Sequence, residues 1–178
     1  MSYSVKAFLI CIAMVLLSST QAQTYKDWGM EFPTSQGGEA QEHFLEGVTA
    51  MHLHEFEDAG DHFRKAQNLA PDFAMAYWGE ALNQHRTIWS IHRLDIARAV
   101  LQRLGATPGE RAAKAPTPRE KAYLAAIEIL FGEGTQLDRQ AAYSMAMRDL
   151  NSAFPDDIEA LAWYTLSLMR ETSGRCVR

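Results

Sequence analysis

Apolar residues recur at helical spacing along most of the chain, and the pattern is clearest between positions 40 and 73, AQEHFLEGVTAMHLHEFEDAGDHFRKAQNLAPDF. It divides this stretch into two amphipathic helices joined by a short turn near His54 and Glu55. Pro71 ends the second helix, because proline lacks an amide hydrogen and clashes with the preceding turn. The stretch therefore predicts a helical hairpin.

Small and bulky residues fall at fixed intervals within this hairpin. Gly47 and Ala59 carry no side chain beyond a methyl group, so the two helices can approach closely. Phe63 would fill the space between this hairpin and the next, and Ala66 would keep the following contact tight. The full set is Gly47, Ala59, Phe63, Ala66 and Pro71.

The pattern restarts after Pro71, although less regularly. It predicts a helix over about 72–86, a connection over 87–92 and a second helix over about 94–104. Three residues occupy the places of Ala59, Phe63 and Ala66 after an insertion of about four residues. They are Ala97, Leu101 and Leu104.

Two capping boxes mark the next helix starts, Thr107-Pro108-Gly109-Glu110 and Thr117-Pro118-Arg119-Glu120. The first predicts a helix of one or two turns, and the second a helix that continues to Phe131. Further helices are expected over about 137–153 and 157–171. No stretch has a convincing strand pattern, so the expected fold class is all-α.

The segment PDFAMAYW at 71–78 is echoed by PDDIEALAWY at 155–164, which indicates internal repetition. With the spacing from Gly47 to Pro71, residues 40–170 resemble the tetratricopeptide repeat (TPR) superfamily. Residues 43–82 are also similar to a group of exported bacterial TPR proteins. The resemblance implies a right-handed solenoid of about three to three and a half helical hairpins. It also implies a concave groove that binds a peptide or protein partner, in a scaffold and not an enzyme.

The resemblance further implies that the first helix of each pair lines the groove, through residues that could equally pack in the core. The candidates in the first pair are Phe44, Val48, Met51 and His52. Those in the second are Met75, Trp78, Leu82, His85 and Arg86, and those in the third are Lys121, Leu124, Glu128 and Phe131.

The N-terminal 22 residues have the features of a secretory signal peptide. Lys6 precedes an apolar run over 7–17, and Thr20-Gln21-Ala22 has the small-residue pattern of a cleavage site. The run is shorter than the roughly 20 residues that span a bilayer. We therefore expect an exported protein, periplasmic or secreted, without a membrane span in the mature chain. An extended leader over 23–38 either docks through its aromatic rings or is disordered, and it precedes a helical domain over 39–171 and a tail over 172–178.

Composition narrows the functional classes. Without Lys6 the chain has 16 Lys and Arg against 22 Asp and Glu, and no dense basic cluster, so nucleic acid is not an expected partner. The mature chain keeps only Cys176, which excludes an internal disulfide. No nucleophile elbow or phosphate-binding loop is present, so we expect neither an enzyme nor a cofactor.

Six histidines leave a metal-binding module or a metal-dependent enzyme as the alternative reading. His52 and His85 would lie at matching depths of adjacent inner helices, and His54 or Glu55 from the turn could add a third zinc or copper ligand. No fixed-spacing motif supports this arrangement, and the competing reading is that these histidines lie on the surface or pack in the core.

The last expected helix is apolar around most of its circumference, whereas a solenoid normally closes with a polar outer face. Either the chain is a fragment of a longer array, or this face meets another molecule or a second copy of the chain. The residues are Ile158, Leu161, Trp163, Tyr164, Leu166, Leu168 and Met169.

Overall fold

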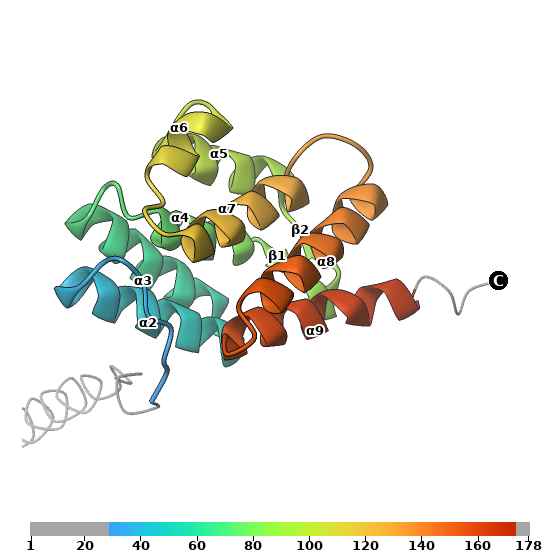
Figure 1. Cartoon of the computed structure of the whole chain (residues 1–178), viewed down its shortest axis with the longest axis horizontal. Coiled ribbons are helices and arrows are strands. Elements are labelled where there is room, and N and C mark those ends of the chain that lie inside the picture. Colours follow the sequence, from blue (N-terminus) through green and yellow to red (C-terminus); the bar gives the residue numbers. More distant parts are fainter. Residues whose placement is uncertain (1–28, 174–178) are drawn as a thin grey trace, which may run out of the picture.

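The structure is a computed structural model that describes residues 29–173 (Figure 1). The expected signal peptide, the first part of the leader with Tyr25 and Trp28, and residues 174–178 lie outside the described residues.

The described residues form eight α-helices, which confirms the all-α class. They are α2 (Gly38–His52), α3 (Phe56–Leu69), α4 (Ala74–Leu82), α5 (Leu94–Leu104), α6 (Pro108–Ala113), α7 (Pro118–Leu130), α8 (Gln136–Ala153) and α9 (Ile158–Ser173). Both predicted capping boxes are formed, at Thr107 and at Thr117.

Consecutive helices lie against one another in Figure 1: α2 on α3, α3 on α4, α4 on α5, α7 on α8, and α8 on α9. The helix α4 also contacts α2 and α7, so it lies at the centre of the molecule. All nine residues of α4 are buried, consistent with this central position. Within residues 29–173, none of the helices has both the length and the apolar character that crossing a membrane requires.

The predicted helix over 72–86 is too long. The helix α4 ends at Leu82, and a small hairpin follows, in which β1 (His85–Arg86) pairs with β2 (Ile91–His92). A 3-10 turn, η2 (Thr87–Trp89), connects them, and Ser90 closes it with a left-handed backbone, φ 56°. These four strand residues are a departure from the prediction that the chain forms no strand.

The small residues of the first hairpin lie where close packing requires them. Ala59, Phe63 and Ala66 are fully buried. A Cβ atom added to Gly47 would lie only 2.7 Å from Cε1 of Phe63, so the glycine is needed for the ring to fit. Ala97, Leu101 and Leu104 of α5 are buried as well.

The described part of the leader docks through Phe32. Its ring is buried against Phe44 of α2, Trp78 of α4 and Tyr123 of α7, with centroids 5.2, 5.6 and 5.1 Å away. The guanidinium of Arg119 covers the Phe32 ring at 4.5 Å. Of the two predicted states of the leader, docking is therefore the one confirmed at Phe32.

A buried carboxylate fastens the leader to α7. Glu120 accepts hydrogen bonds from the backbone amide and the hydroxyl of Ser35, both at 2.8 Å, and from the hydroxyl of Thr117 at 2.8 Å. Burial opposes ionisation of Glu120, but these hydrogen bonds outweigh it and lower its pKa. The carboxylate thus joins the leader to the start of α7.

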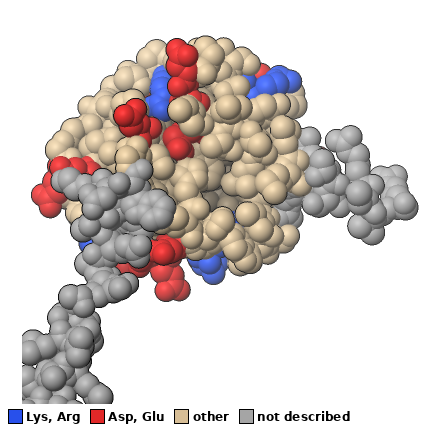
Figure 2. Space-filling view, turned by 90° about the horizontal axis from the view of Figure 1, so that it is seen from below, with Lys and Arg blue, Asp and Glu red and all other residues tan. Residues whose placement is uncertain are grey.

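The face shown in Figure 2 is mostly uncharged, and its few basic side chains lie beside or near acidic ones. A phosphate backbone is tracked by clustered Lys and Arg side chains, and this face has no such cluster among the residues drawn in colour.

Candidate functional site

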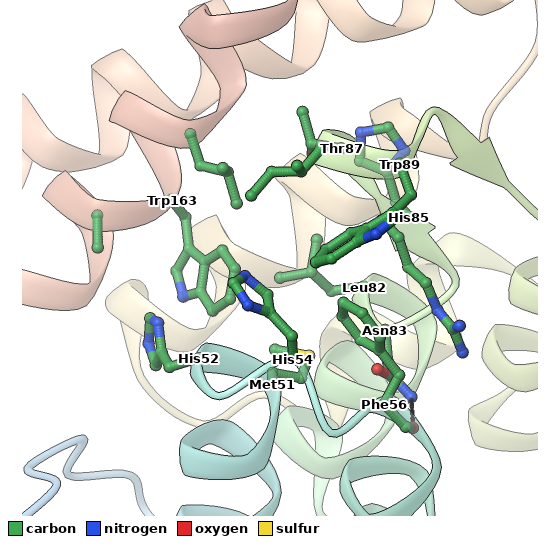
Figure 3. A pocket seen from close by; sticks show the side chains of 14 residues that line it. Met51, His52, His54, Phe56, Leu82, Asn83, His85, Thr87, Trp89 and Trp163 are labelled. Carbon is green, nitrogen blue, oxygen red and sulfur yellow. Dashed lines mark hydrogen bonds between the residues drawn. The ribbon is translucent and has the colours of Figure 1, made fainter.

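A cavity of about 210 Å³ lies where the ends of α2 and α4, the start of α3, the segment 85–89 and α9 meet (Figure 3). Its lining combines aromatic, aliphatic and a few polar side chains. They are Met51, His52, His54, Phe56, Leu82, Asn83, His85, Arg86, Thr87, Ile88, Trp89, Ala162, Trp163 and Leu166.

One wall is a cluster of rings around Trp89. The His54 ring meets Trp89 edge-on at 4.8 Å, and Phe56 meets it edge-on at 5.3 Å. The guanidinium of Arg86 lies 4.3 Å from the Phe56 centroid, a cation–π contact. Trp89 remains 48% exposed, so its ring is available to a ligand.

The opposite wall joins α2 to α9. The ring of His52 stacks on Trp163 with centroids 4.9 Å apart, and its Nε2 lies 2.9 Å from a carboxylate oxygen of Glu159. Trp163 in turn packs edge-on against Trp78 in the core. These contacts place residues from nearly opposite ends of the described chain side by side.

Several buried polar atoms of the lining have no hydrogen-bond partner among the described residues: Asn83 Oδ1, Arg86 Nε and Trp163 Nε1. Burial lowers the pKa of Arg86, and the nearby charge of Arg93 adds to this effect, while Glu57 opposes it. The Nε of Arg86 is therefore a buried donor without a partner, and it favours a ligand that brings an acceptor oxygen such as a carboxylate.

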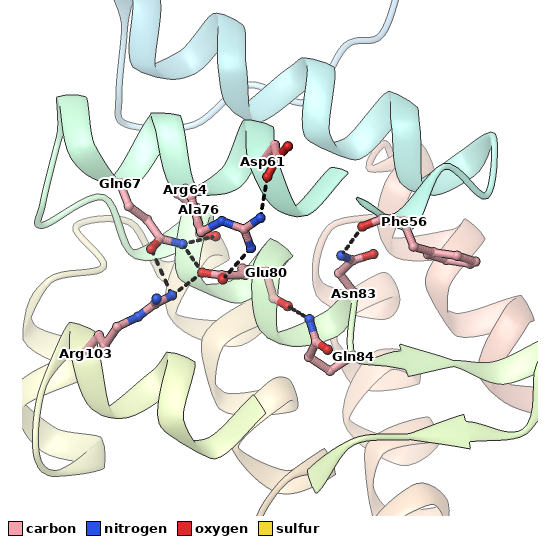
Figure 4. A network of polar contacts seen from close by, with 9 residues as sticks. All are labelled: Phe56, Asp61, Arg64, Gln67, Ala76, Glu80, Asn83, Gln84 and Arg103. Atoms are coloured by element: carbon pink, nitrogen blue, oxygen red, sulfur yellow. Dashed lines mark hydrogen bonds and ion pairs between the residues drawn. The ribbon is translucent and has the colours of Figure 1, made fainter. Parts of the chain in front are cut away.

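A polar network behind the cavity fixes the helix that supplies Leu82 and Asn83 (Figure 4). The buried carboxylate of Glu80 accepts from Gln67 Nε2 at 2.7 Å, from Arg64 Nη1 at 3.3 Å and from Arg103. The Glu80 network joins α3, α4 and α5. It therefore fixes the position of the end of α4 relative to the other two helices. Asn83 Nδ2 then donates to the Phe56 carbonyl at 2.7 Å.

The structure divides the groove residues expected from the sequence. Met51, His52, Leu82, His85 and Arg86 come together in the cavity. Phe44, Val48, Met75 and Trp78 are fully buried, and Leu124 and Phe131 nearly so. Phe32 of the leader packs on Phe44 and Trp78, Trp163 of α9 also packs on Trp78, and His92 stacks on Phe131. For these residues the expectation of an open groove is wrong, and packing in the core is the reading that holds. Glu128 pairs with Arg111 instead.

Sequence reasoning missed Phe56, Ile88, Trp89, Trp163 and Leu166 as lining residues. Ile88 is 55% exposed, and with Trp89 it forms a bulky apolar pair in the connection over 87–92. Two such residues on a loop are the signal that could have indicated a binding surface.

The three histidines suggested as metal ligands have other contacts. His52 is engaged by Glu159 and Trp163, and His54 packs against Trp89 and Phe56. His85 Nδ1 lies 2.9 Å from His92 Nδ1. Within residues 29–173, the one set of three His, Cys, Asp or Glu ligand atoms that converges is His43, Glu46 and His62. The suggested set of His52, His54 and His85 is therefore not assembled.

Comparisons of the chain with protein-family models, with curated proteins and with solved structures give no match. The geometry of the described residues is accordingly the basis for a functional conclusion.

Proposed function

We propose that this chain is an exported TPR-like helical-repeat protein, periplasmic or secreted, that binds a segment of a partner protein. The repeat architecture is supported by the successive contacts of α2 with α3, α4 with α5, and α7 with α8, with α9 as the first helix of a further pair. The short helix α6 interrupts the regularity. Export rests on the signal-peptide pattern of residues 1–22.

The cavity beside Trp89 and Arg86 is the binding site in this proposal, in place of a long groove. At about 210 Å³ it is smaller than the roughly 300–1,000 Å³ of pockets that enclose a drug-sized molecule. It suits one or two side chains of a peptide. A single anchor in a pocket commonly carries most of the affinity of a peptide or protein partner.

Charge and chemistry define the partner segment. The half-exposed Trp89 offers an apolar surface, and Arg86 offers a cation with an unpartnered Nε. The matching ligand is a segment with one bulky apolar side chain next to a carboxylate, either an acidic residue or the C-terminal carboxyl group. The observation that carries the proposal is this pairing of a half-exposed aromatic ring and a guanidinium with an unpartnered buried Nε at one cavity.

The test is display selection of random peptides on the purified mature chain, followed by affinity measurements with one selected peptide. We expect enrichment of a bulky apolar residue beside a carboxylate. Trp89→Ala should weaken binding about tenfold or more, and Arg86→Gln by a similar factor. Leu137→Ala is the matched control, because Leu137 is 72% exposed on α8, away from the cavity lining. Peptides that bind both cavity variants as tightly as the wild type would refute the site.

The apolar face of α9 remains a candidate for self-association. Ile158, Leu161 and Met169 are 78%, 50% and 55% exposed, whereas Trp163 is buried. Light scattering of the wild type and of Leu161→Glu tests whether this face joins two copies of the chain. If the wild type is a dimer and Leu161→Glu is a monomer, this face makes a contact between copies. If both proteins are monomers, self-association through this face is excluded.

A further inference from the structure

Three ligand atoms converge on the outer side of the first hairpin, away from the cavity. His43 and Glu46 lie one turn apart on α2, and His62 lies opposite them on α3. The Glu46 Oε2 atom is 2.9 Å from His43 Nδ1 and 2.9 Å from His62 Nδ1, and the two Nδ1 atoms are 3.2 Å apart. His52, at the cavity, is nine residues further along α2, about 13 Å by the rise of a helix.

While Glu46 is ionised, both Nδ1–H groups can donate to its Oε2 atom across 2.9 Å. When both Nδ1 atoms are unprotonated, the same three atoms are lone-pair donors that lie close enough together to share one metal ion.

The separations suit such a cation. Tetrahedral zinc has ligand bonds of about 2.0–2.2 Å, which places its ligand atoms roughly 3.3 Å apart. In this triangle, a point about 2.0 Å from all three atoms lies roughly 1 Å out of their plane, which leaves a fourth position open. Two imidazole nitrogens and one carboxylate oxygen form a ligand set that zinc accepts.

We propose that His43, Glu46 and His62 form a binding site for a divalent transition-metal ion of the zinc class, with water as the fourth ligand, which clamps α2 to α3. The side chains are 21%, 18% and 17% exposed, so the site is partly buried and still open to solvent. Glu39 lies 4.0 Å from His43 Nε2, which is beyond hydrogen-bond distance, so it adds only a nearby negative charge to the site.

Metal binding would require Nδ1 of both rings to be unprotonated, with the hydrogen of each neutral ring on Nε2.

The experiment uses the mature chain, tag removed and chelator-treated, with Cys176→Ser to remove the thiol as a competing ligand. Zinc alone is titrated by calorimetry, and cobalt alone is followed by its visible absorption. We expect one ion per chain, the intense absorption of low-coordinate cobalt and a rise in Tm that grows with zinc concentration. Glu46→Gln and His62→Gln should each abolish all three.

His52→Gln is the matched control, because it removes a partly exposed histidine from the same helix and should leave metal binding unchanged. Melting curves without metal show whether each variant is folded. Long-range nitrogen–proton spectra supply a second readout, since zinc should shift the Nδ1 resonances of His43 and His62 selectively. Absence of the cobalt absorption in the wild type, or zinc binding that survives His62→Gln, would overturn the proposal.

Discussion

The ring of Phe63 lies directly against the backbone of Gly79. A Cβ atom added to Gly79 would come within 2.3 Å of Phe63 Cε1, closer than real Cβ contacts allow. Gly47 meets the same ring from α2, so one phenylalanine of α3 fixes the distance to both neighbouring helices. Because Phe63 is fully buried, its ring has no free space into which it could move.

Gly79→Ala should therefore destabilise the protein, although alanine is the better helix former. The overpacking costs roughly 1–3 kcal/mol, against about 1 kcal/mol gained from helix propensity. Urea denaturation measures the difference. Gly109→Ala is the control, because a Cβ there meets nothing closer than 4.0 Å, and it should be neutral or stabilising. Adding Phe63→Leu to Gly79→Ala should recover part of the lost stability, because the smaller side chain makes room for the new methyl group. If the effects of the two substitutions on the free energy of unfolding simply added, the contact between Phe63 and position 79 would be contradicted.

Phe32→Ala should show that the leader is part of the core. The substitution leaves a cavity between α2, α4 and α7 and should cost roughly 3–5 kcal/mol in the free energy of unfolding. Thermal melting followed by circular dichroism measures it. Trp89→Ala, which removes a ring that is 48% exposed, should change Tm much less. If Phe32→Ala left Tm unchanged, docking of the leader would not contribute to stability.

Glu120 should produce an acid-sensitive contribution to stability. Its pKa is lowered in the folded state, because the hydrogen bonds from Ser35 and Thr117 outweigh the cost of burial. The stabilisation is therefore complete above the unfolded pKa of about 4.3, and it is lost as the pH falls through the lower folded pKa. Glu120→Gln should reduce stability at neutral pH and flatten its decline in acid. Glu133→Gln, with a side chain that is 97% exposed, should leave the pH profile unchanged.

The Glu80 network predicts that removing the Glu80 charge lowers the free energy of unfolding by an amount that depends on Arg64 and Arg103. Glu80→Gln removes the charge that Arg64 and Arg103 share, and it should cost roughly 1–3 kcal/mol. The value stays below that of a fully buried ion pair, because both arginine side chains are about half exposed. A double-mutant cycle of Glu80→Gln with Arg103→Gln measures the coupling. Independent effects of the two substitutions would contradict a shared network.

His54 combines backbone strain with a position at the cavity. It has a left-handed backbone, φ 65°, which costs a residue with a Cβ atom about 1 kcal/mol. His54→Ala and His54→Gly both remove the ring that contacts Trp89, so both should weaken peptide binding. Only glycine relieves the strain, so His54→Gly should be the more stable by about 1 kcal/mol. Equal stability of the two variants would show that the turn tolerates the conformation without cost.

Local signals account for most of the helices. The two capping boxes and the apolar period define α5, α6 and α7, because caps and proline act within one helical turn. The hairpin at 85–92 was missed because two-residue strands are too short to show alternation. Its register, with His85 opposite His92, comes from pairing that no local pattern records.

The site was harder to predict for a different reason. Periodicity shows that Phe44 and Trp78 share the apolar faces of their helices, but it does not show what covers those faces. The covering groups are Phe32, which belongs to no helix, and Trp163, which is 85 residues after Trp78. The end of the α4 face, beside Leu82 and Arg86, is not covered in this way and lines the cavity.

The contact of His52 with Glu159 spans 107 positions of the chain, and the cavity has walls from both sides of that contact. A polypeptide interrupted before α9 could still build the first hairpins, but it would present only half of the recess. Under the proposed function, a chain shortened before α9 should therefore bind the partner segment much more weakly than the longer chain.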